Sequence, residues 1–178
     1  PAAVEQATFV DEETAFAHAA VATVQHVLVP MSWSSEDRQA PYDWLNARLG
    51  RPLLVHDVNR QPLLHLFPII TLDNVPSGSI WIAADKALGD TAVALHEHRA
   101  FPDFEGAVER AERLVSAQHP GWSLRDWLPV VYSYPRLGVL LTLAKPETNE
   151  TIEVVLDIYD LTEAPRIDDV VAFTPEEL

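Results

Sequence analysis

Two pairs of histidines occupy positions from which they could bind a metal ion together. His96 and His98 lie two residues apart in a segment with strand character, so both imidazoles project from one face. A hairpin with its turn at residues 59–62 would place His56 opposite His65 on neighbouring strands. Because imidazole nitrogens are common ligands of divalent metals, this arrangement predicts a metal site.

The four histidines have two possible interpretations, a metal site and a set of ordinary strand residues. Asp103 or Glu105 could add an oxygen ligand to the four imidazoles. Alternatively, the histidines are half-exposed strand residues that bond water or neighbouring carboxylates. We therefore expect no cofactor, and a divalent metal is the alternative that the histidines offer.

Aromatic residues near turns are the second candidate site. Tyr132 and Tyr134 alternate along an expected strand, which puts both rings on one face beside Arg136. Trp33 and Trp122 lie next to connections where side chains are often exposed. Since Trp, Tyr and Arg dominate the energetics of protein interfaces, these five residues are the predicted binding residues.

No motif indicates catalysis, and we predict no catalytic residue. The sequence contains neither Gly-x-Ser-x-Gly nor a glycine-rich phosphate loop, and its 178 residues include no cysteine. Asp157 and Asp160 flank Tyr159, but two carboxylates divide acid and base roles only where their environments differ. We expect both carboxylates to lie on a solvated surface.

The charge balance favours protein partners over polyanions. There are 12 basic and 27 acidic residues, so the formal net charge is 12 − 27 = −15. Nucleic acids and anionic membranes bind chiefly through Lys and Arg, so neither is an expected partner. No apolar run is long enough to span a bilayer, and no signal peptide is visible at the start. A cytoplasmic location is the default expectation.

Hydrophobic periodicity predicts three helices and seven strands. The first helix begins after Thr8 as N-cap and ends before Pro30, with one stripe facing a core. That stripe comprises Phe9, Phe16, Ala20, Val24 and Val27. A short helix is expected at 41–49 and a long amphipathic one at 104–118, whose expected apolar face comprises Phe104, Ala107, Val108, Ala111, Leu114 and Val115. The expected strands are 53–58, 63–70, 79–84, 91–98, 127–134, 139–144 and 151–161.

These elements predict one α+β domain over residues 1–178. Its antiparallel sheet of six to seven strands carries two main helices on one face. The order of elements repeats loosely, so residues 8–100 and 101–161 are candidate α-βββ half repeats. Residues 162–178 are acidic and contain proline, which is typical of a surface tail.

Part of the chain resembles known propeptide modules. The segments Val55-His56-Asp57-Val58-Asn59-Arg60-Gln61-Pro62-Leu63 and Gly78-Ser79-Ile80-Trp81-Ile82-Ala83-Ala84-Asp85 look like PepSY-type and cystatin-like modules. The resemblance covers about residues 52–98, with a fainter echo at 127–160. It implies a curled antiparallel sheet around a helix and a role as protease inhibitor or folding chaperone. In element order and acidity the chain is also similar to type III secretion chaperones.

Three functions are compatible with these patterns. The first is a non-enzymatic protein-binding module, acting as inhibitor, chaperone or immunity-like protein toward a basic partner. The second is a metal-dependent enzyme built on the histidine cluster. The third is a structural subunit that forms a homodimer.

Overall fold

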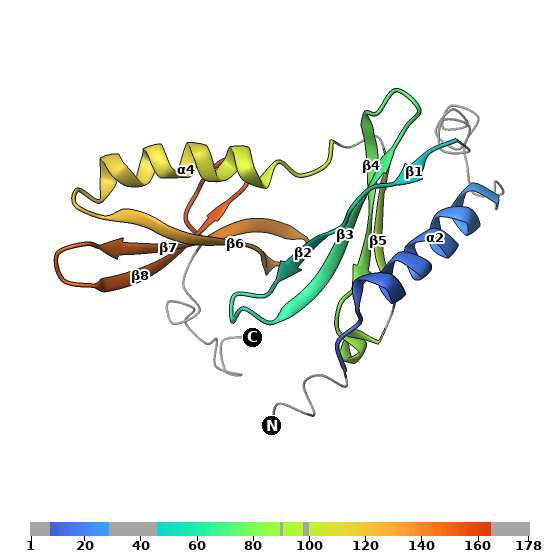
Figure 1. Cartoon of the computed structure of the whole chain (residues 1–178), viewed down its shortest axis with the longest axis horizontal. Coiled ribbons are helices and arrows are strands. Elements are labelled where there is room, and N and C mark those ends of the chain that lie inside the picture. The colour runs from blue at the N-terminus through green and yellow to red at the C-terminus, as the bar shows by residue number, and fades with distance from the viewer. Residues whose placement is uncertain (1–7, 29–45, 90, 98–99, 165–178) are drawn as a thin grey trace, which may run out of the picture. The chain divides into compact units, whose positions relative to one another are not determined.

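The chain folds into two compact units, Pro1–Pro102 and Asp103–Leu178. The structure is a computed structural model that describes residues 8–28, 46–89, 91–97 and 100–164. The first unit contains helix α2 and strands β1–β5, and the second contains helix α4 and strands β6–β8 (Figure 1). Within each unit the strands pair antiparallel, which confirms the α+β class. The eight strands are one more than expected.

The first unit is built around its longest strand, β3. The elements are α2 (Glu12–Leu28), β1 (Arg48–Leu49), β2 (Leu53–His56), β3 (Pro62–Ile70), β4 (Pro76–Ala83), a 3₁₀ turn (Lys86–Leu88) and β5 (Ala92–Glu97). On one side β3 pairs with β4, which in turn pairs with β5. On its other side β3 pairs with both β1 and β2. The two short strands thus follow one another along the same edge of β3.

The additional strand β1 replaces part of an expected helix. Arg48 and Leu49 pair with Ile70 and Ile69, so the prediction of a helix through residue 49 is wrong, and residues 41–45 lie outside the described part of the chain. Beyond β1, the Gly50 amide donates to the Pro68 carbonyl at 2.8 Å. A Cβ at Gly50 would lie 2.7 Å from side-chain atoms of both Ile70 and Pro68, so only glycine fits here. Backbone pairing with β3 therefore overrides the helical spacing of these apolar residues.

Helix α2 is capped by Asp11, three residues after the expected cap, Thr8. Its first residue is Glu12, and the Thr14 amide donates to Asp11 Oδ1 at 2.7 Å. Asp11 rather than Thr8 therefore performs the capping role at this end of the helix. Phe9 lies before the helix and forms an isolated antiparallel bridge with Asp85.

The fully buried residues of α2 are alanines, so the predicted stripe is wrong in part, although the ring of Phe16 packs edge-on against Phe67 and Ala20 is half-buried. Ala15 and Ala19 are fully buried, whereas Phe16 is 47% exposed and Val24 is 53% exposed. The side chain of Val27 lies outside the described part of the structure. The cluster that contains the two alanines also includes Val10, Phe67, Ile80 and Ile82, with Ala22 and Leu49 packed against it. Small side chains let the helix approach the strands closely, and periodicity does not distinguish faces when nearly every side is apolar.

Exchanging alanine for leucine tests which side of α2 faces the strands. Ala19→Leu adds three carbons to a fully packed site and is expected to cost about 1–3 kcal/mol of unfolding free energy. Ala17→Leu makes the same change at an exposed position of the same helix, so it should cost no more than about 0.5 kcal/mol. Denaturant unfolding of both variants measures the difference. Equal losses would show that our assignment of the buried face is incorrect.

The second unit is a three-stranded meander with one helix. Its elements are α4 (Phe104–Gln118), β6 (Ser123–Ser133), β7 (Arg136–Lys145) and β8 (Glu150–Asp157). Strand β7 lies between β6 and β8. The turn from β6 to β7 occupies Tyr134 and Pro135 alone, whereas we expected it to extend to Gly138.

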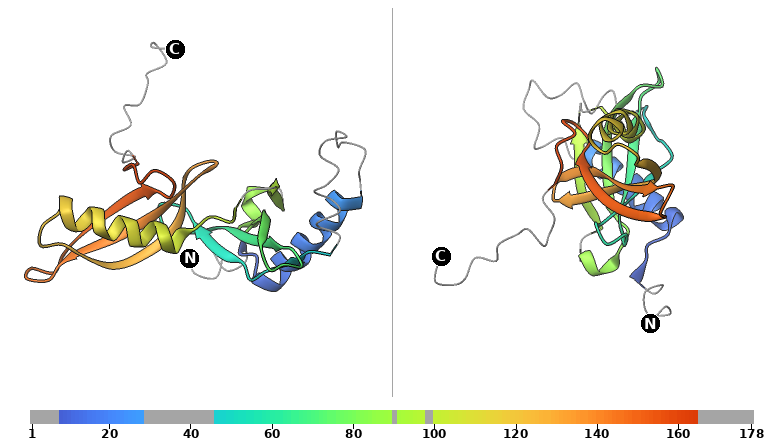
Figure 2. Two further views of the ribbon diagram at one scale, coloured as in Figure 1. Left: turned by 90° about the horizontal axis from the view of Figure 1, so that it is seen from above. Right: turned by 90° about the vertical axis from the view of Figure 1, so that its left-hand side faces the viewer.

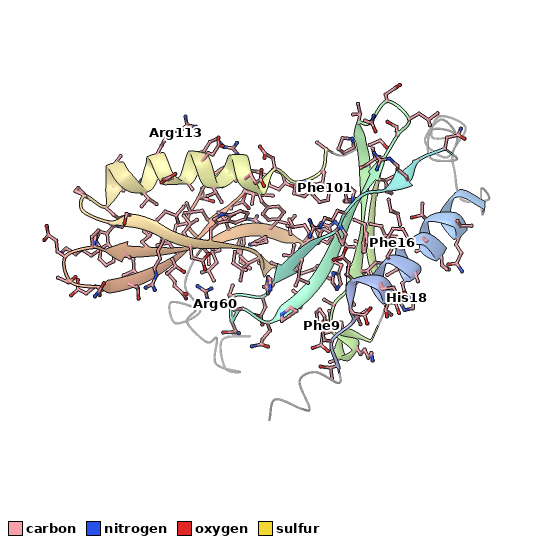
Figure 3. All side chains as sticks on the ribbon, in the orientation of Figure 1. Phe9, Phe16, His18, Arg60, Phe101 and Arg113 are labelled. Carbon is pink, nitrogen blue, oxygen red and sulfur yellow. The ribbon has the colours of Figure 1, made fainter. Side chains whose placement is uncertain are left out.

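Helix α4 has the bounds and the facing that its sequence predicts. Its inner side chains are buried: Phe104, Ala107, Val108, Ala111 and Val115. The charged residues of the opposite face are exposed, and Figure 3 shows Arg113 on the side of α4 away from the strands. Helix α4 packs against β6 and β7, as the views in Figure 2 also show. Here the apolar stripe is narrow and the rest of the helix is charged, so the pattern identifies one face.

The two units differ in strand number among the described residues, five against three, so only the second has the α-βββ order. The repeat stays a prediction.

The start of the expected tail is attached to β8, because the Ala164 amide donates to the Val155 carbonyl at 2.9 Å. Residues 165–178 lie outside the described part of the chain. Neither of the helices described here has the length and apolar character needed to cross a bilayer.

Candidate functional site

The histidine register differs from the one that the metal hypothesis needs. His65 pairs with Leu54, and His56 pairs with Pro62, so the predicted pairing of His56 with His65 is wrong. His65 is buried, and its Nε2 donates to the Val10 carbonyl at 2.8 Å. That nitrogen holds the segment before α2 against β3, which is a structural role.

The remaining proposed ligands do not form a cluster in the described structure. The backbone of His96 pairs with that of Ser79 in β4, while His98 lies outside the described residues. Asp103 is the N-cap of α4, where its Oδ1 accepts from the Gly106 amide at 2.9 Å. Glu105 is exposed in the first turn of that helix. Among the described residues, no three His, Cys, Asp or Glu side chains are close enough to hold a metal ion.

The second candidate site includes a buried carboxylate, that of Asp157, which accepts three hydrogen bonds. The Tyr132 hydroxyl donates to Asp157 Oδ2 at 2.7 Å. The other oxygen, Oδ1, accepts from the amides of Tyr159 at 2.8 Å and Asp160 at 3.3 Å. Asp157 is buried, so the expectation that it lies on a solvated surface is wrong. Its carboxylate ties the end of β6 to the turn after β8.

Gly138 provides the space in which the Tyr132 ring lies. A Cβ on Gly138 would be 2.8 Å from Cδ1 of Tyr132 and 2.9 Å from the Leu156 carbonyl oxygen. Gly138 lies on β7, directly opposite Asp157 on β8. The ring therefore crosses β7 at its one glycine and reaches the carboxylate on the far strand. A side chain at position 138 would block this path.

Two exposed tyrosines and an exposed arginine lie in or beside the turns that follow β6 and β8. The register of β7 and β8 continues past Asp157, because the Ile158 amide donates to the Leu137 carbonyl at 3.2 Å. Tyr159 follows in the turn at residues 158–160, where the chain folds back so that Leu156 and Glu163 form an isolated bridge. Tyr134 lies in the turn just before Arg136; it is 61% exposed, and Tyr159 is 72% exposed. We call Tyr134, Arg136 and Tyr159 the tyrosine–arginine surface.

Arg136 interacts electrostatically with the Tyr132 hydroxyl and with the Asp160 carboxylate. Burial raises the pKa of the Tyr132 hydroxyl, and the hydrogen bond to Asp157 raises it further, while Arg136 acts in the opposite direction. Hydrogen bonds from Thr162 lower the pKa of Asp160, to which the hydroxyl donates at 2.6 Å and the amide at 2.8 Å. The charge of Arg136 also lowers the pKa of Asp160. The Arg136 guanidinium therefore interacts both with Tyr132 and with the turn that carries Asp160.

Alkaline pH should weaken the Tyr132–Asp157 link. The folded state raises the pKa of Tyr132, so its contribution to stability is complete below about pH 10 and is lost as the pH rises through the folded pKa. Thermal melts of the wild type and Tyr132→Phe should differ by a constant amount near neutral pH. Above about pH 10 this difference should shrink, because only the wild type titrates at this position. A difference independent of pH would contradict the assignment.

The structure unites three of the five predicted binding residues. Tyr132 and Arg136 interact at one end of the β6–β7 hairpin, and Tyr134 lies in the turn between them. Trp122 is half-buried before the first residue of β6, and an 11-residue strand spans roughly 35 Å, so it lies at the opposite end. Trp33 lies outside the described residues.

Asp157 and Tyr159 are functional candidates that the sequence argument missed. The available signal was local, because an aspartate at the end of a strand often accepts from amides two or three residues later. The sequence Asp157-Ile158-Tyr159-Asp160 follows an expected strand and fits this pattern. Its partner Tyr132 is 25 residues away, and only the strand order brings the two together.

Comparison with protein-family models, with curated proteins and with solved structures finds no match for this chain. The fold and the site define the class of protein directly: an α+β protein with two units. Its second unit carries two exposed tyrosines and a hydrogen-bonded Tyr132–Asp157 pair. The resemblance to PepSY-type and cystatin-like modules and to secretion chaperones stays a prediction.

Proposed function

We propose that this protein is a non-enzymatic protein-binding module, which acts in the cytoplasm as an inhibitor, chaperone or immunity-like protein. The tyrosine–arginine surface at the end of the β6–β7 hairpin contacts the partner. The observation that carries the proposal is that Tyr134 and Tyr159 are exposed in the turns after β6 and β8, and that the buried Asp157 carboxylate holds the second of these turns.

The residue types and the rigidity of the surface support binding. Tyr and Arg are enriched among the side chains that contribute most to protein association, and two exposed tyrosines on one small surface are therefore informative. Asp157 fixes the turn that carries Tyr159 through two backbone hydrogen bonds. A surface already held in its binding conformation loses little entropy on association, which favours affinity.

The charge of the whole chain supports a partner with a basic surface. A formal net charge of −15 attracts basic proteins at long range and speeds their encounter. The tyrosine rings then provide contact area that does not depend on charge. A homodimer is the other partner that we expect.

Quantitative affinity capture from the source lysate tests the proposal. Wild type should retain a stoichiometric partner at low ionic strength and release it as salt is raised, because screening weakens long-range attraction. Tyr134→Ala combined with Tyr159→Ala should reduce the retained partner at least about tenfold, equivalent to about 1.4 kcal/mol.

A matched control separates loss of binding from loss of folding. Glu109→Ala changes an exposed residue of α4 in the same unit and should retain the partner as wild type does. Circular dichroism melts should show that all three proteins are equally folded, since the substituted tyrosines are exposed. Retention of the same partner by the double tyrosine variant would disprove the role of this surface.

A further inference from the structure

The peptide group that joins Ile158 to Tyr159 is held by side chains on both of its sides. Its N–H, the amide of Tyr159, donates to Asp157 Oδ1 at 2.8 Å. Its carbonyl oxygen, that of Ile158, accepts from Nη2 of Arg110 at 3.2 Å. The N–H and C=O of a trans peptide group point in opposite directions from one rigid plane. The two contacts together therefore fix the rotation of this plane and the direction of the backbone that carries the exposed Tyr159 side chain.

Arg110 connects this turn to a distant part of the chain. It belongs to helix α4 and precedes Ile158 by 48 residues. The side chain of Ile158 is buried, and its amide donates to the Leu137 carbonyl at 3.2 Å. Strand β7 therefore holds the amide side of Ile158, while helix α4 holds its carbonyl side.

Arg110 also takes part in an ion pair, which offers a simpler role for it. Its Nη1 lies 3.8 Å from Asp103 Oδ2, and the two side chains are 42% and 69% exposed. Ion pairs that are this open to solvent contribute little to stability. Asp103 also has a task of its own, because its Oδ1 accepts from the Gly106 amide at the start of α4. The shorter contact with Ile158, which joins two elements, is therefore the more informative one.

We propose that Arg110 is a positioning residue for partner binding: from helix α4 it holds the Ile158–Tyr159 peptide group, so that the Tyr159 ring meets the partner in one orientation. This inference rests on the proposed function, in which Tyr159 contacts a partner protein. Without Arg110 the turn still has Asp157 as an anchor, so it should loosen rather than unfold. The partner would then have to order the turn on binding, which costs affinity.

Fluorine NMR of the full chain labelled with fluorotyrosine tests the orientation without any partner. The chain has four tyrosines, and the variants Tyr159→Phe and Tyr134→Phe identify two of the four signals. Arg110→Met keeps a long side chain but removes every donor, so the Tyr159 signal should shift or broaden. The Tyr134 signal should stay in place, because Tyr134 lies in the turn between β6 and β7.

Arg113→Met is the matched control for the loss of an arginine from α4. It removes the same charge from the same helix, at a side chain that points away from the strands (Figure 3). The Tyr159 signal should therefore be unchanged in this variant.

Two further variants separate the contact with Ile158 from the ion pair. Arg110→Lys keeps the positive charge and a donor group, so it should restore much of the wild-type Tyr159 signal. Asp103→Asn keeps a favourable N-cap and removes the charge that pairs with Arg110. This variant should leave the Tyr159 signal as it is in the wild type.

Retention of the partner from the source lysate measures the effect on binding. Arg110→Met should bind the partner about threefold to tenfold more weakly than the wild type, and Arg113→Met should bind it equally well. Circular dichroism melts of the same proteins show that they are folded at the temperature of the binding experiment.

Three results would overturn the proposal. An unchanged Tyr159 signal in Arg110→Met would show that Arg110 does not position the turn. An equal shift in Arg113→Met or Asp103→Asn would show that the charge of the helix, and not the hydrogen bond, is responsible. Undiminished binding by Arg110→Met, when the double tyrosine variant has lost the partner, would exclude a role in binding. If the double tyrosine variant keeps the partner, the proposed function itself is overturned, and the Tyr159 signal still decides whether Arg110 orients the turn.

Discussion

Val108→Asp is expected to lower the free energy of unfolding by about 3–5 kcal/mol, because it places an unpaired carboxylate on the inner side of α4. Val108 is buried on the same face as Ala107 and Ala111, both of which are inaccessible to solvent. The structure offers the new charge no cationic partner on this face, since Arg110 and Arg113 lie among the exposed residues. Denaturant unfolding followed by circular dichroism measures the loss.

The neighbouring residue provides the control for this prediction. Glu109→Ala removes a charge from the exposed face of the same helix turn and should change the unfolding free energy by no more than about 0.5 kcal/mol. Similar losses in the two variants would mean that α4 packs with a different face from the one described.

Asp157→Ala is expected to cost about 2–4 kcal/mol, the largest effect that we predict within the candidate site. The substitution removes the acceptor of three donors, the Tyr132 hydroxyl and the amides of Tyr159 and Asp160. Hydrogen bonds to a charged acceptor are stronger than neutral ones, and the Tyr132 hydroxyl loses its acceptor on β8. Unfolding experiments near neutral pH measure this change.

Two further variants show how the effect of Asp157→Ala is divided. Tyr132→Phe removes one of the three hydrogen bonds and should cost about 1.5–3 kcal/mol. In the double variant the two losses should not add, because both include the same hydrogen bond. Asp160→Ala, at an exposed position in the same turn, should cost less than either of these substitutions. Full additivity would contradict the link between β6 and the turn after β8.

The same variants connect stability with the proposed function. Because Asp157 orients the turn that carries Tyr159, Asp157→Ala should also weaken partner binding at temperatures where the variant is folded. Tyr134→Ala and Tyr159→Ala should affect binding alone, since both side chains are exposed. This contrast separates residues that touch the partner from those that hold the surface in place.

Much of the secondary structure could be predicted from residue patterns alone. Helix α4 was predicted with its bounds and its inner face, because its apolar residues form one narrow stripe among charged ones. The seven expected strands all occur, although their ends differ by a few residues. These features depend on local periodicity, which neighbouring residues in the sequence determine.

The errors share a physical cause, which is that contacts distant in sequence decided them. Arg48 and Leu49 became strand because β3 supplied partners. The inner side of α2 was partly misassigned because nearly all its sides are apolar, and its fully buried residues are the small Ala15 and Ala19. The pairing of His56 with His65 failed because the turn between β2 and β3 closes in another register. One residue of register changes every partner along a strand pair.

The sequence by itself determined the class of the fold, the net charge of the chain and the residue types that it carries. Only the tertiary structure decided that Tyr132 reaches Asp157 across Gly138 and that the same carboxylate holds the turn that carries Tyr159. Composition and local spacing are properties of the chain, whereas a site made from three strands depends on strand order and register. Those are set by the packing of the whole unit, which no short stretch of sequence encodes.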